Sequence, residues 1–136
     1  MKISILLPYK ENFSPLYPGA ISIFLNGIIL KSKYKKKIIV YGNTKYKKKL
    51  NNNYINLNIK KTFLKSSTKS YLDAFIKKEF KNKSDLIEIH NRPKYINYLS
   101  KFFNNFVLFF HNDPIDMEDS KTIKQRINLL NKTKKI

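Results

Sequence analysis

Short apolar runs alternate with longer helical patterns along this chain, and that alternation restricts the fold more than any other feature of the sequence. Five runs have the length and the bounding turn residues of buried strands. They occupy residues 2–7, 37–41, 54–59, 85–89 and 106–110. Because strands separated by helical segments join through right-handed crossovers, this order predicts an α/β fold: a Rossmann-like parallel sheet with helices on both faces.

Helical patterns lie between most of these runs and after the last one. The first helix is expected to begin near Pro18, which suits an opening turn, and apolar residues on most of its faces predict that it is buried. Amphipathic spacing predicts a second helix over 67–80, and a third is expected over 94–103. Ser120 is predicted to cap a last helix that runs through Leu130.

The strand runs differ in character, and the loops after three of them stand out. The run at 106–110 (FVLFF) is the most apolar and is expected at the centre of the sheet, whereas the alternating run at 54–59 is expected near an edge. Loops of unusual composition follow the first, fourth and fifth runs, at 15–20, 90–93 and 111–116. Ligands of open parallel sheets bind at the carboxyl ends of the strands, so function is expected at these loops.

Size and composition favour one folded domain spanning residues 1–136. A chain of 136 residues with 42% hydrophobic residues can build one core, and it is too apolar to remain disordered. The absence of cysteine excludes disulfides and thiol nucleophiles. No apolar run reaches the roughly 20 residues of a membrane span, and the opening run is too short for a signal peptide. The chain is therefore expected to be cytoplasmic.

The formal net charge of +19 raises the question of a polyanionic partner. Only Arg92 and Arg126 are arginines, and the remaining cations are lysines, which occur with abundant Asn, Ile, Tyr and Phe as in AT-rich coding sequence. Proteins that read nucleic acid more often use the planar fork of arginine. The lysines are interpreted mainly as a solvated surface. No nucleic-acid partner is expected, but peripheral contact with an anionic membrane is expected.

The two histidines of the chain each follow a buried strand run and are each followed at once by asparagine. Imidazole, amide and carboxylate groups at one sheet edge can bind sugar hydroxyls or a phosphate, and an arginine adds a permanent cation. A loop role in hydrogen bonding remains the alternative, and no HxH, HxxxH or HExxH spacing favours a metal. The candidate substrate-binding residues are His90, Asn91, Arg92, His111, Asn112 and Asp113.

Gly19 opens the first helix, where backbone N–H groups and the helix dipole favour a phosphate or carboxylate. A simple turn is the alternative, and chain reversal explains a Pro-Gly pair more often than ligand binding does. Neither G-x-G-x-x-G nor G-K-[ST] is present, which argues against a dinucleotide site and a P-loop. No cofactor and no metal are expected.

Several motifs together resemble the amino-terminal domain of retaining GT-B glycosyltransferases of the lipopolysaccharide and polysaccharide type. The motifs are KISILLP, Pro18-Gly19-Ala20 at a helix start, DLIEIHNRP, FVLFFHNDP and a Ser-Lys-Thr helix start. The resemblance implies an enzyme that transfers a sugar from a nucleotide sugar to a glycan or lipid-linked acceptor. It implies that His111 acts at the reacting sugar, that Gly19 approaches the donor diphosphate, and that His90, Asn91 and Arg92 shape the acceptor pocket.

The resemblance also implies that this chain is the acceptor-side half of the enzyme. A carboxyl-terminal donor-binding domain is expected beyond Ile136, residues 134–136 are expected to open a sixth strand, and this half alone is expected to be inactive. Membrane-anchored acceptors would place it at the inner membrane face. Two alternatives stay open, a basic nucleic-acid-binding module and a flavodoxin-like binding or signalling module, although no acidic cluster follows the first strand to hold magnesium.

Overall fold

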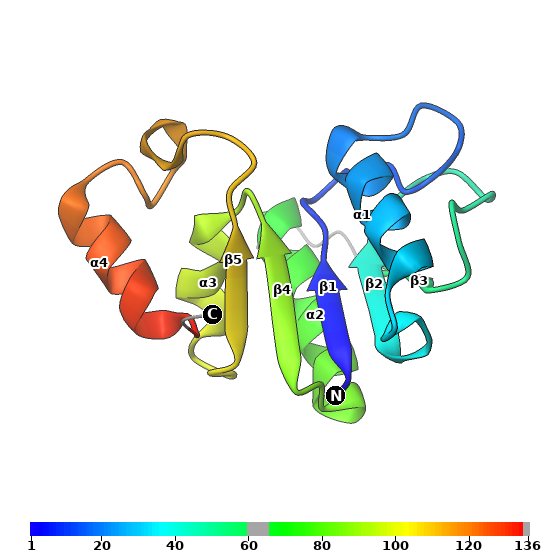
Figure 1. Cartoon of the computed structure of the whole chain (residues 1–136). Coiled ribbons are helices and arrows are strands. Elements are labelled where there is room, and N and C mark those ends of the chain that lie inside the picture. The colour runs from blue at the N-terminus through cyan, green and yellow to red at the C-terminus, as the bar shows by residue number, and fades with distance from the viewer. Residues whose placement is uncertain (60–65, 135–136) are drawn as a thin grey trace.

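The computed structural model describes residues 1–59 and 66–134, which form an α/β domain built on a parallel sheet (Figure 1). Within the described residues the sheet has five strands in the order β3-β2-β1-β4-β5, and every neighbouring pair is parallel. The strands are β1 (Ile3–Leu6), β2 (Ile38–Gly42), β3 (Tyr54–Asn56), β4 (Leu86–His90) and β5 (Phe106–Phe109). The predicted Rossmann-like fold is confirmed.

Helices cover both faces of the sheet, as predicted: α1 lies in front of it in Figure 1, and α2 and α3 lie behind. The α-helices are α1 (Ala20–Lys31), α2 (Ser67–Asn82), α3 (Pro93–Leu99) and α4 (Ile123–Lys132), and short 3-10 turns are η1 (Lys35–Lys37) and η2 (Pro114–Asp116). Among the described residues, none of the helices has the length and apolar character needed to cross a bilayer.

Alternation along the central strand β1 divides the interior into two cores. Ile3 and Ile5 pack with α1 on one face, whereas Leu6 packs with α2 and α3 on the other. Both cores contain fully buried side chains, such as Leu25 on α1 and Phe75 on α2. Burial of a side chain of this size stabilises the fold by about 1.5–3 kcal/mol, so the two helical layers hold the sheet from both sides.

The strand β5 lies at one edge of the sheet, so the expectation that this apolar run is central was wrong. Phe106 is fully buried against the α2 and α3 layer, while Phe109 and Phe110 keep 40% and 36% of their surface exposed. The central strand is β1. The chain adds β2 and then β3 on one side of it, and β4 and then β5 on the other side. Apolar content therefore reflects the packing of one face of β5 and not its position in the sheet.

Several predicted boundaries shift by a few residues. β3 lies at the opposite edge, as expected, but ends at Asn56. α3 ends at Leu99. Ser120 does not cap the last helix; Thr122 does, in a capping box with Gln125, and the Ser120 hydroxyl donates to backbone carbonyls of the preceding turn.

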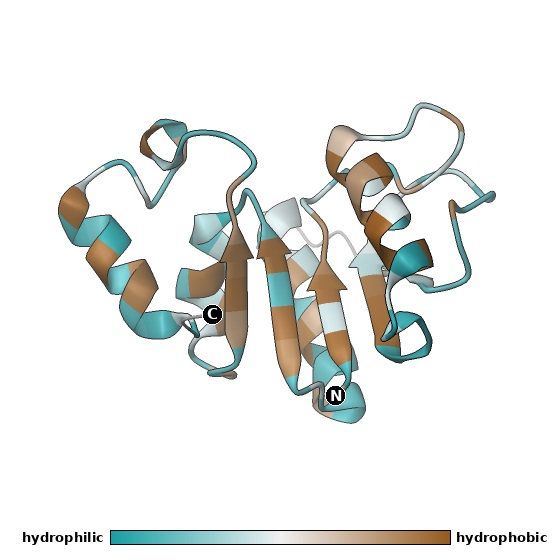
Figure 2. Cartoon of the chain, viewed as in Figure 1, coloured by the Kyte–Doolittle hydropathy of each residue, from teal (hydrophilic) through white to brown (hydrophobic). Residues whose placement is uncertain are grey.

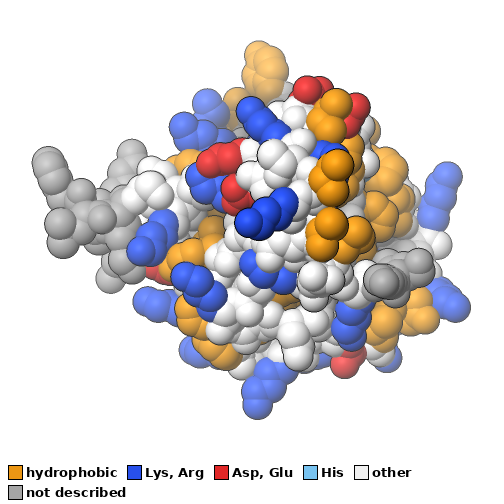
Figure 3. Space-filling model, turned by 90° about the vertical axis from the view of Figure 1, so that its left-hand side faces the viewer, with side chains coloured by type: hydrophobic (Ala, Val, Ile, Leu, Met, Phe, Trp, Pro, Cys, Tyr) orange, Lys and Arg blue, Asp and Glu red, His pale blue; other side chains and the backbone are white. Residues whose placement is uncertain are grey.

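Two helices expose more apolar surface than their sequence suggested. α1 is not buried on all sides: Phe24 and Ile28 are about half exposed on its outer face, which Figure 2 shows as brown patches on α1. On α4, Ile127 and Leu130 face solvent while Leu129 packs into the core. Figure 3 views the α4 side of the molecule, where hydrophobic side chains form a row among dispersed cations and carboxylates.

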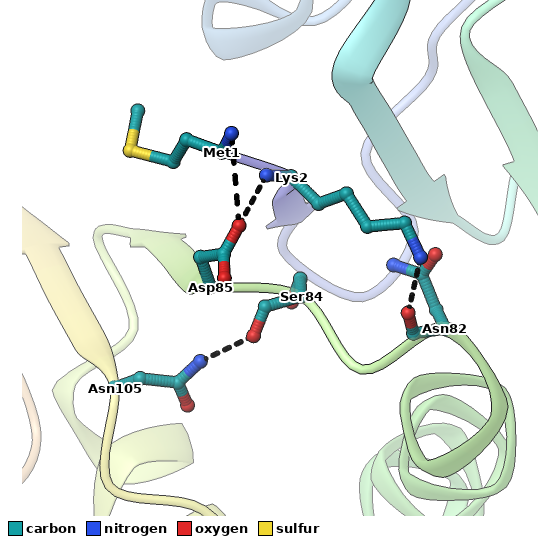
Figure 4. Close-up of polar contacts among 6 residues, drawn as sticks. All are labelled: Met1, Lys2, Asn82, Ser84, Asp85 and Asn105. Carbon is teal, nitrogen blue, oxygen red and sulfur yellow. Dashed lines mark hydrogen bonds and ion pairs between the residues drawn. The ribbon is translucent and has the colours of Figure 1, made fainter.

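Polar contacts fasten the amino ends of β1, β4 and β5, at the bottom of the sheet in Figure 1 (Figure 4). The Lys2 backbone N–H donates to the Asp85 carboxylate at 2.6 Å, and its ammonium donates to the Asn82 carbonyl at 2.6 Å. The Asn105 amide donates to the Ser84 carbonyl at 2.8 Å. These contacts hold together the amino ends of the three strands, and the loops predicted to carry function lie at the opposite, carboxyl ends.

The chain returns to the free edge of β5 after α4. Thr133 forms an isolated parallel bridge with Phe106, and the Lys134 N–H donates to the Phe106 carbonyl at 2.8 Å. A sixth strand was predicted over 134–136, of which residues 135 and 136 lie outside the described residues.

Candidate functional site

The direction of the chain reverses between β1 and β4, which are neighbours at the middle of the sheet. After β1 the chain passes to α1 on one face, and after β4 it passes to α3 on the other (Figure 1). Such a switch point opens a crevice at the carboxyl ends of the two strands, where doubly wound folds bind ligands. The observed order also differs from the flavodoxin-like order 2-1-3-4-5, which removes the topological basis of that alternative.

The two histidines meet at this crevice and connect to a carboxylate. His90 Nε2 lies 2.7 Å from Glu88 Oε1, and His90 Nδ1 lies 2.7 Å from His111 Nε2. The imidazole centroids are 5.0 Å apart and the ring planes differ by 21°, so the rings meet edge to edge through their nitrogens. His90 is fully buried and His111 is exposed. In the Glu88–His90–His111 network the buried His90 therefore lies between a half-buried carboxylate and an exposed imidazole.

Strand geometry explains why these three side chains come together. Glu88 and His90 are two residues apart on β4, so they share the face that lies toward α1. β5 pairs with β4 in the register that sets Phe109 beside His90, and His111 follows two residues later on the same face. Asn91, with a left-handed φ of 50°, accepts from the His111 backbone N–H through its side chain at 2.7 Å and holds the second loop in place.

The hydrogen bonds assign the tautomers of the network. The Glu88 carboxylate accepts only, so His90 Nε2 carries a proton and His90 Nδ1 of the neutral ring is an acceptor. His111 Nε2 therefore donates to His90 Nδ1, which leaves the lone pair on His111 Nδ1. The exposed end of the network is a base, and the other end is a half-buried carboxylate that can stabilise positive charge on the buried His90.

Aromatic rings enclose the imidazoles and affect their titration. Phe24 of α1 meets the His111 ring edge-on at a centroid distance of 4.9 Å, and Phe109 lies nearly parallel to the His90 ring at 5.2 Å. Partial burial and then the neighbouring His90 lower the pKa of His111 below its ordinary value of 6.5, against the opposing effect of Glu88. His111 is accordingly neutral near pH 7, in the form that accepts a proton.

A carboxylate of the chain itself occupies the helix start at Gly19. Glu11 Oε1 accepts from the Ser22 N–H at 3.1 Å, and a Cβ atom on Gly19 would lie 1.8 Å from the same oxygen. Gly19 therefore allows the close approach of Glu11, which satisfies the helix dipole internally. A donor phosphate at this position would have to displace Glu11.

On the other side of the crevice, toward α2 and α3, lies a cavity of about 900 Å³, the switch-point cavity. Tyr9 lines it from the loop after β1, and Asn91 and Arg92 line it from the loop after β4. Its charged lining also includes Lys69 of α2, Asp116 of η2 and the ion-paired Lys94 and Glu118. The structure thus separates the predicted residues: Arg92 and Asn91 face this cavity, whereas both ring nitrogens of His90 are engaged in the network.

The last two predicted residues lie in the exposed loop after β5. Asn112 is exposed, and Asp113 uses its carboxylate locally, where Oδ1 accepts from the Ile115 N–H at 3.0 Å and caps η2. Across the described ranges, no cluster of three or more His, Cys, Asp or Glu side chains is arranged to hold a metal ion.

Three further residues of the candidate site were not predicted from the sequence. Glu88 had a legible signal, because an acidic residue two positions before His90 in a strand shares its face. Glu11 reaches Gly19 only through the fold of the intervening loop, and Lys69 reaches the cavity from a helix distant in sequence. Neither of these two relations has a local sequence signal.

Comparison with known proteins found no matching family model, no matching curated protein and no matching solved structure. The fold defines the class: a doubly wound α/β domain with a cavity at its β1–β4 switch point.

Proposed function

We propose that this chain is the acceptor-side domain of a glycosyltransferase that moves a sugar from a nucleotide sugar to a glycan or lipid-linked acceptor. The Rossmann-like fold and the carboxyl-end position of the crevice are consistent with this class of enzyme. The observation that carries the proposal is the Glu88–His90–His111 network, which presents a neutral, exposed imidazole at the crevice.

In the proposed reaction His111 accepts the proton of the acceptor hydroxyl. The hydroxyl oxygen forms a bond to the anomeric carbon of the donor sugar as the bond from that carbon to the nucleoside diphosphate breaks. This single displacement inverts the anomeric configuration, so the proposed reaction differs at this point from that of the retaining enzymes that the motifs resemble. The hydroxyl proton passes to His111 Nδ1, the atom whose lone pair is free in the assigned tautomer. A positioned base of this kind contributes roughly 10²–10⁴-fold to a rate.

The rest of the network removes the charge created by this transfer. His111 can donate its Nε2 proton to His90 Nδ1, because the two nitrogens are already 2.7 Å apart. The positive charge then lies on His90, in contact with the Glu88 carboxylate at 2.7 Å. Because His90 is fully buried and Glu88 is half-buried, water screens this attraction less than it would at the surface, and the carboxylate stabilises the imidazolium.

The donor side of the reaction lies outside the 136 residues in this proposal. Glu11 occupies the start of α1, so the described residues supply no open helix terminus for a diphosphate at Gly19. The chain is expected to bind acceptor fragments and to bind nucleotide sugars only weakly. We further propose that its lysines attract it to anionic membrane surfaces that carry the acceptor.

Ligand titration of the isolated chain tests the proposal. We expect acceptor oligosaccharides to shift the NMR signals of the His111 ring, and calorimetry with a panel of nucleotide sugars to give weak binding or none. Submicromolar binding of a nucleotide sugar by this chain alone contradicts the assignment to the acceptor side.

A further inference from the structure

We infer that the switch-point cavity binds an anionic saccharide, with a phosphate or carboxylate group held by Arg92 and Lys69 and the sugar ring held between tyrosines. The cavity volume of about 900 Å³ lies within the range of small-molecule sites and accommodates a sugar with one or two substituents. Its position at the carboxyl ends of β1 and β4 is the position at which this class of fold binds ligands.

The cations around the cavity are not equivalent. Lys94 pairs with Glu118 at 2.6 Å, so its charge is already compensated. Arg92 and Lys69 form no ion pair within residues 1–59 and 66–134. Both line the cavity, so two positive charges face it without a carboxylate partner.

Arg92 is also held in place before any ligand binds. Its Nη1 donates to the Asn91 carbonyl at 2.7 Å, and its charge lowers the pKa of Tyr95 against the larger rise that burial causes. A guanidinium has five N–H donors in a fixed fork, and these contacts leave others for an oxyanion. Such a fork binds phosphate or carboxylate in a bidentate manner.

The walls suit a sugar ring better than a bare anion. Tyr9 and Tyr98 are half-buried in the lining, and Thr68 adds a hydroxyl group. The Tyr98 hydroxyl donates to Asp73 at 2.6 Å, which raises the pKa of Tyr98 to about 12 and fixes its ring. Asp116 provides an acceptor for ligand hydroxyls. Apolar ring faces combined with a few placed polar groups are the usual composition of a small-ligand site.

The identification of this saccharide with the acceptor rests on the proposed function, but its binding does not. The cavity and the His111 imidazole use different side chains, so the two proposals can fail separately. A chain that binds the saccharide and catalyses no transfer would overturn the proposed function only.

Calorimetry on the full 136-residue chain in 150 mM salt tests the inference, with four probes: glucose 6-phosphate, glucuronate, glucose and inorganic phosphate. We expect the two anionic sugars to bind at least about tenfold more tightly than glucose, because charge-assisted hydrogen bonds to Arg92 are lost with a neutral sugar. The tighter of the two anionic sugars identifies phosphate or carboxylate as the preferred group.

Variants with the same change of charge supply the control. Arg92→Gln should weaken binding of the preferred anionic sugar about tenfold or more, whereas Lys33→Gln, near η1, should leave it unchanged. Arg92→Lys keeps the charge without the fork and should give an intermediate loss, and thermal melts check that each variant folds. His111→Ala should bind as the wild type does.

Three outcomes overturn the inference. Equal weakening by Arg92→Gln and Lys33→Gln would mean that the net charge alone attracts the anion. Equal affinity for glucose and the anionic sugars would show that no cation of the cavity binds the anionic group. Equal affinity for inorganic phosphate and the anionic sugars would show that the cavity does not bind the sugar ring.

Discussion

Nδ1 of His90 lies 2.7 Å from Nε2 of His111, which joins a buried strand end to an exposed loop by one hydrogen bond. Because Glu88 accepts from the other nitrogen of His90, a proton gained at the surface can be matched by a charge shift onto the buried His90, in contact with a half-buried carboxylate. In the proposed reaction His90 acts through His111, by orienting its ring and by accepting its Nε2 proton, and does not touch the substrate.

Glu88→Gln tests whether the carboxylate tunes the network. Glutamine keeps an oxygen that accepts from His90 Nε2, so the rings should stay in place while the negative charge is lost. We expect the rate of sugar transfer to fall about tenfold to a hundredfold. Because Glu88 raises the pKa of His111, the acid limb of the pH–rate profile should also move to lower pH. A fall in rate without movement of that limb, or the same result for the exposed Glu118→Gln, contradicts the assigned role.

The stability of the fold should depend on the titration of His111. Burial and His90 lower its folded-state pKa below 6.5, so the unfolded chain binds more protons in the window just below that value. The contribution is present above about pH 6.5 and is lost as the pH falls through the lowered pKa. Urea unfolding of the wild type and His111→Gln between pH 7.5 and 5 should show the wild type losing more stability. Parallel curves for the two proteins would refute this.

Glu79 is expected to be the polar side chain on which stability depends most. It is 2% exposed and accepts from the Ser4 hydroxyl at 2.6 Å and the Ser84 N–H at 2.7 Å. Glu79→Ala leaves these buried donors without a partner and should lower the free energy of unfolding by about 2–4 kcal/mol. Urea denaturation measures the change. Glu118→Ala is the matched control, since that exposed carboxylate should have little effect; equal losses would contradict the account.

Attraction to anionic membranes is expected to follow from the lysine content. Each lysine near an anionic surface contributes about 1 kcal/mol, and the effect weakens as salt screens it. At low salt, co-sedimentation should show more chain bound to vesicles with about 30% anionic lipid than to neutral vesicles. Equal binding to both vesicles at every salt concentration would mean that the charge of +19 has no such role.

The sequence was sufficient to predict the alternation of strands and helices and the end of the sheet at which the candidate residues lie. The position of β5 was not predictable from its apolar run, because strand order follows from the crossovers. The contact between His90 and His111 was predictable, because each histidine stands at the end of a strand run and is followed by asparagine. It also requires that β4 and β5 are neighbours, which the structure shows.

Other parts of the site depend on loops whose paths have no periodic signal. Glu11 accepts from the first turn of α1 at Ser22, eleven residues further along the chain, and Asp113 turns its carboxylate to η2 instead of to the crevice. Arg92 follows His90 by two residues, but the turn at Asn91, with φ of 50°, directs it to the switch-point cavity. Side-chain direction in such turns is set by tertiary contacts.

Substitution of His111 tests the central claim most directly. In a transfer assay that supplies a nucleotide-sugar-binding domain, His111→Ala should lower kcat about a hundredfold or more, the usual effect of removing a positioned base or one transition-state hydrogen bond. Circular dichroism should show the fold unchanged, and added imidazole should restore part of the rate. A variant that folds and transfers sugar at nearly the wild-type rate would contradict the role of His111, and with it the function proposed for the Glu88–His90–His111 network.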